Sequence, residues 1–165
     1  MTFDLLLCRG RDVECANRCA IGIYRMSDDK DLISNLLRDA LVALSLPPAE
    51  QVRVTQPGCV SCELIEDFSH GYTCFTQSCS DQLSGPASQL LAGIDSKIES
   101  LSDDDCVCFD NTVLDRPLWS QLRKLAAKAL AALGWDDHQL DAYTETEPGV
   151  WRRSNSNIVP QSDFD

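Results

Sequence analysis

The sequence lacks any apolar run that could cross a bilayer. Its longest apolar stretches cover residues 5–8 and 41–46, whereas a membrane-spanning helix needs about 20 apolar residues. No basic residue precedes the short apolar run at the N-terminus, and Asp4 stands at its start, so this segment does not have the pattern of a secretory signal. These features predict a cytoplasmic protein.

Histidine is scarce, and the sequence motifs of common enzymes are missing. The only histidines are His70 and His138. No nucleophile elbow, phosphate-binding loop, dinucleotide-binding loop or zinc-protease motif occurs in the chain. His70 also falls where we predict a turn, and a polar residue is expected there in any case. The sequence therefore favours a non-catalytic protein over an enzyme.

Basic residues are almost missing from the middle of the chain. The net charge is −12, from 26 acids and 14 bases. Residues 61–115 hold 11 acids and one base, Lys97, while the segments before and after each carry a net charge of −1. A field of this sign repels nucleic-acid phosphates and attracts a basic surface. Direct binding of nucleic acid through this segment is therefore disfavoured.

This charge distribution predicts a non-catalytic binding protein that docks onto a basic protein partner, such as a toxin, a nuclease or a nucleic-acid-binding protein. Inhibitors and immunity proteins act in this way when their acids replace phosphates in a basic cleft. We expect the binding acids to share one exposed face. They are Glu63, Glu66, Asp67, Asp103, Asp104 and Asp105. The alternative is that the charge serves only solubility.

Cysteine, by contrast, is abundant, with nine residues. The number is odd, so the chain cannot pair all of them internally. Four of them form a C-x2-C-x11-C-x4-C pattern, which is Cys59, Cys62, Cys74 and Cys79. Because two thiolates at this close spacing can bind one tetrahedral metal ion, the alternative to the binding protein is a zinc-binding module or an enzyme with a cysteine-centred site. Zinc is the only cofactor that the sequence suggests.

The ligand set depends on the local structure. A hairpin with its turn at His70 would place Cys74 opposite Glu66, about 13 Å along the strand from Cys62. Cys79 would return to the open end, so a metal would bind Cys59, Cys62 and Cys79. The fourth ligand would come from Cys106, Cys108, Cys15 or Cys19. Without the hairpin, the four cysteines of the pattern would surround the metal, and without a metal these thiols would fill the core.

A thiol-redox role for Cys59 and Cys62 is disfavoured at this stage. Redox pairs of this spacing stand at the start of a helix, where the first thiol is a stronger acid. Here the residues after Cys62 suggest a strand, and their acids would raise the pKa of a thiol.

The periodicity of apolar residues predicts an α+β fold. Helices are expected between residues 27 and 47, 84 and 103, and 115 and 134, with a short helical piece over 136–143. Strands are expected over residues 2–8, 20–26, 51–55, 62–68, 72–77, 106–109 and 150–153. Strands that follow one another without a helix predict a mixed or antiparallel sheet with about three helices packed on it. Residues 1–154 would form one domain, and residues 155–165 a flexible acidic tail.

Overall fold

A computed structural model of the chain describes residues 26–153, with side chains from residue 30 onward. In that range it contains five α-helices and one two-stranded antiparallel sheet, so it is mostly helical and α+β in a broad sense. The helices are α2 (Met26–Ser45), α3 (Pro48–Thr55), α4 (Val60–Ser78), α5 (Gly85–Glu99) and α6 (Pro117–Leu133). Short 3-10 helices cover Ser80–Gln82 (η1), Asp103–Cys106 (η2) and Asn111–Asp115 (η3), and the strands are β1 (Thr144–Glu147) and β2 (Val150–Arg152).

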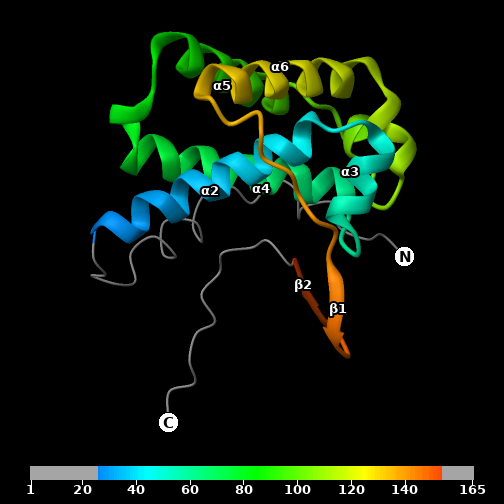
Figure 1. Cartoon of the computed structure of the whole chain (residues 1–165). Helices are drawn as coiled ribbons and strands as arrows, with labels where there is room; N and C mark the ends of the chain where they lie inside the picture. Colours follow the sequence, from blue (N-terminus) through cyan, green and yellow to red (C-terminus); the bar gives the residue numbers. More distant parts are fainter. Residues whose placement is uncertain (1–25, 154–165) are drawn as a thin grey trace.

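The core lies between the helices and not between helices and a sheet. Helix α2 packs against α4 on one side and α6 on another, and α6 packs in turn against α5 (Figure 1). Trp119 of α6 is fully buried in this core, as are Phe68 and Phe75 of α4. The β1–β2 hairpin projects from the helices, and every residue in its strands is exposed. Three helices packed on a sheet are therefore not confirmed.

The three long predicted helices are confirmed as α2, α5 and α6. The Ser84 hydroxyl caps α5 by accepting the Ala87 N–H at 3.3 Å, and Pro86 stands in its first turn. Pro117 begins α6, and Gly134 ends it with a φ of 69°, a backbone conformation that suits glycine. No described helix has the length and apolar character needed to span a membrane.

The predicted hairpin over residues 62–77 is wrong, because this segment is one continuous helix, α4. Its buried residues recur every three or four positions, which is the spacing of one helical face. Gly71 suggested a turn, but it lies inside α4 at the point where this helix contacts α2. A Cβ atom on Gly71 would lie 2.9 Å from Cα of Leu37 in α2, so only glycine allows the two backbones this close.

Three other local predictions are also wrong. Residues 51–55 form helix α3 instead of a strand, because Pro48 stands in its first turn and buried Gln51 donates from Nε2 to the Leu44 carbonyl at 2.9 Å. Residues 106–109 form the end of η2 and a turn, and residues 136–143 form a turn and an extended segment. The edge strand predicted over 150–153 is confirmed as β2. The strand predicted over 2–8, most of the one over 20–26 and the acidic tail at 155–165 lie outside the described residues.

Candidate metal centre

Cys59 and Cys62 stand at the N-terminal end of α4. Cys59 is the residue immediately before the helix, and Cys62 is in its first turn. Because a helix brings residues three positions apart onto one face, the two side chains point the same way. Their Sγ atoms are 3.1 Å apart, and both side chains are half-buried.

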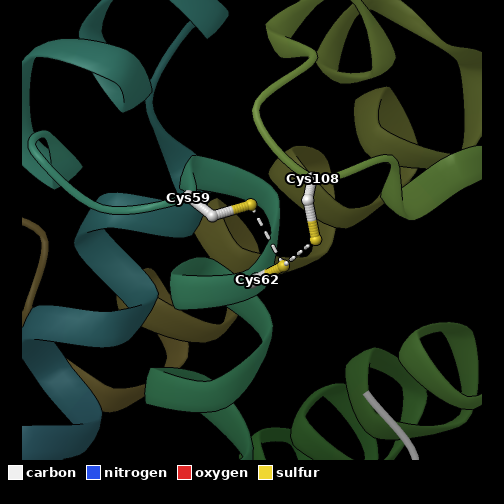
Figure 2. Close-up of side chains that lie close together, drawn as sticks. All are labelled: Cys59, Cys62 and Cys108. Atoms are coloured by element: carbon white, nitrogen blue, oxygen red, sulfur yellow. Dashed lines mark hydrogen bonds between the residues drawn. The ribbon is translucent and has the colours of Figure 1, made fainter. Parts of the chain in front are cut away.

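The third thiol comes from the loop between α5 and α6. The Sγ of Cys108 lies 3.5 Å from that of Cys62 (Figure 2). The sulfur atoms of Cys59, Cys62 and Cys108 all lie within 4.8 Å of one another. We call these three residues the thiol cluster.

The loop that carries Cys108 is fixed by hydrogen bonds on both sides. Before it, Ser102 and Asp105 cap the start of η2 reciprocally, and the indole Nε1 of Trp119 donates to the Asp105 carbonyl at 2.9 Å. After it, Asp110 accepts the Thr112 N–H at 3.0 Å and so caps η3. Since Trp119 is buried in the core, the position of the loop follows from the packing of α6.

Phe109 holds the loop against Cys59. It has a φ of 61°, which is uncommon outside glycine, although its side chain is 78% exposed and packs little. In this conformation its N–H donates to the Sγ of Cys59 at 3.4 Å. Strained backbone is often kept at functional sites, and N–H donors around sulfur ligands orient them and tune a bound metal.

Cys59 and Cys62 differ in acidity. Partial burial raises the pKa of the Cys59 thiol. Hydrogen bonds with Cys62 and from the Phe109 amide lower it by more than burial raises it, so the pKa of Cys59 is below its ordinary value. Burial and the neighbouring thiols of Cys59 and Cys108 raise the pKa of Cys62. Cys59 is therefore the first of the two to ionise, and Cys62 resists ionisation while Cys59 carries a negative charge.

Cys79 does not belong to the thiol cluster. It follows α4 and lies 17 residues after Cys62, which corresponds to about 25 Å along a helix. It is fully buried, and its thiol lies 3.9 Å from the Lys30 carbonyl. The expectation that Cys79 returns to Cys62 is wrong because it depended on the hairpin. The sequence named Cys108 only as one of several fourth ligands, and no spacing signal distinguished it.

Cys74 and Cys106 are also outside the cluster. Cys74 is buried in α4, with its sulfur 3.9 Å from the His70 ring nitrogens. Cys106 ends η2 and is half-buried. The remaining cysteines of the chain, which include the candidate ligands Cys15 and Cys19, lie outside the described residues.

The predicted partner-binding acids form two groups. Glu63, Glu66 and Asp67 lie within the first half of α4, and Asp103, Asp104 and Asp105 form the start of η2. Asp103 and Asp104 are exposed. Asp105 bonds to Ser102 and lies 3.4 Å from Arg116, and these contacts lower its pKa. That the two groups share one exposed face remains a prediction.

Asp67 has the most perturbed carboxyl group of the six. Loss of surrounding water and repulsion by Glu63 raise its pKa to about 6, although nearby Arg153 acts in the opposite direction. It lines a cavity of about 560 Å³ between α2, α4 and the hairpin. The carboxyl therefore has a like charge from Glu63 and an opposite charge from Arg153 around it.

Comparisons with protein-family models, curated proteins and solved structures found no match. Any assignment of function therefore depends on the side chains described above.

Proposed function

We propose that the chain is a metal-binding module in which Cys59, Cys62 and Cys108 bind one Zn²⁺ ion as thiolates. The observation that carries the proposal is the convergence of three sulfur atoms from two segments that are 46 residues apart. Sulfur ligands favour soft or borderline metals, and zinc is the common choice for thiolates in a tetrahedral site.

The sulfur distances support this proposal. Zinc binds thiolate sulfur at about 2.3 Å, so two sulfurs of a tetrahedral site lie about 3.8 Å apart. The separations of 3.1 Å between Cys59 and Cys62 and 3.5 Å between Cys62 and Cys108 need only small side-chain movements to reach that value. Three protein ligands leave a fourth tetrahedral position for water or another residue.

Titration of the reduced, metal-free chain with Zn²⁺ against a chromophoric chelator tests the proposal. We expect one Zn²⁺ per chain. Replacement by Co²⁺ should give the intense near-ultraviolet charge-transfer band of thiolate ligands. Cys59→Ser, Cys62→Ser and Cys108→Ser should each weaken zinc binding by about 100-fold or more, because even residues that only support metal ligands contribute 10- to 100-fold.

Cys79→Ser is the matched control, since Cys79 is a cysteine of the same helix region but lies outside the cluster. Its zinc affinity should equal that of the unaltered chain. No zinc binding by the reduced chain, or an equal loss in Cys79→Ser and Cys62→Ser, would contradict the proposal. A cytoplasmic location is part of the proposal, because a reducing compartment keeps the thiols available to the metal.

We also propose that the acids of α4 bind a basic protein partner, of the kind that an inhibitor or immunity protein recognises. The supporting observation is that α4 places three acids within five positions, Glu63, Glu66 and Asp67, of which the last two are exposed, and that their charges repel one another. A basic side chain placed there would relieve this repulsion, and the net charge of the whole chain would speed its approach.

A triple variant tests the second proposal. Glu63→Gln, Glu66→Gln and Asp67→Asn together should abolish capture of a basic partner at low salt, while the unaltered chain should lose the same partner only at high salt. The control triple variant, Asp136→Asn, Asp137→Asn and Glu147→Gln, removes the same charge from exposed positions outside α4. Equal loss of capture in the two triple variants would show that total charge, not the α4 acids, is responsible.

A further inference from the structure

Cys59 and Cys62 have the geometry of a dithiol that can close to a disulfide. Cys59 immediately precedes α4 and Cys62 lies in its first turn, with their Sγ atoms 3.1 Å apart. A disulfide bond is about 2.05 Å long and joins residues whose Cα atoms are roughly 4.4–6.8 Å apart, a range that includes positions three residues apart in a helix. Closure therefore needs a shift of about 1 Å and no change in the path of the backbone.

The sequence disfavoured a redox role for Cys59 and Cys62 because the residues after Cys62 suggested a strand, and the structure contradicts that strand. The residues after Cys62 form a helix, so the pair stands at a helix N-terminus. The positive end of the helix and the Phe109 N–H both face the Cys59 sulfur, which favours negative charge there. The Cys62 sulfur lies 3.1 Å from the Cys59 sulfur.

We propose that Cys59 and Cys62, in the metal-free chain, act as a dithiol that reduces small neutral or cationic disulfides. Cys59 attacks the substrate and Cys62 resolves the intermediate. This activity uses two thiols of the proposed metal site, but it does not require Cys108 and does not depend on metal binding.

The reaction balances as a two-electron exchange. The Cys59 thiolate attacks one sulfur of the substrate disulfide, forming a mixed disulfide and releasing the first thiolate, which takes the proton of Cys62. The Cys62 thiolate then attacks the Cys59 sulfur, and the Cys59–Cys62 bond forms as the second thiolate leaves and is protonated by water. The protein dithiol is oxidised, and the substrate is reduced to two thiols.

The charge around the cluster selects the substrate class. Residues 58–63 and 106–110 contain two acids, Glu63 and Asp110, and no base, and Arg116, which acts on Asp110, is itself paired with Asp105 at 3.4 Å. The Glu63 side chain lies against Gly58, the residue before Cys59. A Cβ atom on Gly58 would be 2.9 Å from Cγ of Glu63. A negative field at this entrance repels anionic disulfides and attracts cationic ones.

Stopped-time thiol counting and intact mass measurement on the full-length, metal-free chain test the proposal with three probes. Cystamine is cationic, hydroxyethyl disulfide is neutral and glutathione disulfide is anionic. We expect the rate of Cys59–Cys62 formation to fall in that order, with cystamine about tenfold or more faster than glutathione disulfide at low salt. The difference in rate between cystamine and glutathione disulfide should become smaller at high salt. At low salt, Glu63→Gln should also make it smaller.

Single variants assign the roles. Cys62→Ser should accumulate a mixed disulfide on Cys59, found by peptide mapping, whereas Cys59→Ser should form no mixed disulfide at this site. Cys108→Ser should weaken zinc binding by about 100-fold or more but still form the Cys59–Cys62 bond, so a failure of the metal proposal and a failure of the dithiol proposal give different results. A Cys62–Cys108 bond as the main product would overturn the proposal. Equal rates of cystamine reduction by Cys59→Ser and by the unaltered chain would also overturn it. Helical circular dichroism checks that each variant is folded.

Discussion

Cysteines stand near both ends of α4, but the two ends place them in different surroundings. At the N-terminal end, Cys59 and Cys62 are half-buried and meet Cys108 from another segment. At the C-terminal end, Cys74 and Cys79 are buried, and neither belongs to the thiol cluster. The surroundings of these cysteines therefore depend on how deeply each end of α4 is buried, and not on the spacing of the cysteines in the sequence alone. The N-terminal end is suited to ligand chemistry, and the C-terminal end to packing.

The largest effect on stability is expected at the C-terminal end. Phe75 is fully buried there and meets the Trp135 ring edge-on at 5.7 Å between centroids. Phe75→Ala should lower the free energy of unfolding by about 3–5 kcal/mol, because it removes apolar contacts and leaves a cavity. Urea unfolding of the reduced, metal-free chain measures this loss.

Cys62→Ala is the comparison at the other end of the helix. In the metal-free chain it should cost less than about 1 kcal/mol, because a half-buried side chain has fewer contacts to lose. Equal losses for Phe75→Ala and Cys62→Ala would contradict the division of α4 into a packing end and a ligand end.

An intermediate effect is expected where α4 crosses α2. Gly71→Ala places a Cβ atom 2.9 Å from the Leu37 backbone, which cannot move without shifting α2. The substitution should destabilise the chain by about 1–3 kcal/mol, in spite of the better helix propensity of alanine. Thermal and urea unfolding both measure this change.

Gly93→Ala in α5 is the matched control, because a Cβ atom there meets nothing within 4 Å. It should stabilise the chain by about 0.5–1 kcal/mol through helix propensity. The same sign for both glycine substitutions would show that Gly71 is not a close-contact position.

The helices that the sequence predicts correctly are those in which periodicity and end signals agree. In α6, apolar spacing, Pro117 and Gly134 all indicate the same helix. In α4, the tripeptide at 69–71 suggested a turn, while the helical spacing of Val60, Leu64, Phe68 and Phe75 was present in the same residues. A glycine required by a neighbouring helix is indistinguishable from a turn glycine until that neighbour is known.

The candidate site could be predicted only where its residues are close in sequence. Cys59 and Cys62 are identified by their spacing, because the distance between them is set within one helical turn. The contribution of Cys108 depends on how α6 positions the loop through Trp119 and Asp105, which is a tertiary effect. The contact between the Phe109 N–H and the sulfur of Cys59, at the start of α4, follows from the same packing.

The smallest expected effect concerns Asp67, between the two ends of α4. Its pKa is raised to about 6, first by loss of surrounding water and then by Glu63, against about 3.9 in an unfolded chain. The folded state therefore disfavours the ionised carboxyl, and this cost appears as the pH rises from about 4 to 6 and is constant above. Because Asp67 is exposed, solvent screens most of this cost, so Asp67→Asn should make the chain only slightly more stable at pH 7, with the advantage disappearing as the pH falls to 4. Urea unfolding at a series of pH values measures the difference, and a gain that is the same at pH 4 and pH 7 would contradict the raised pKa.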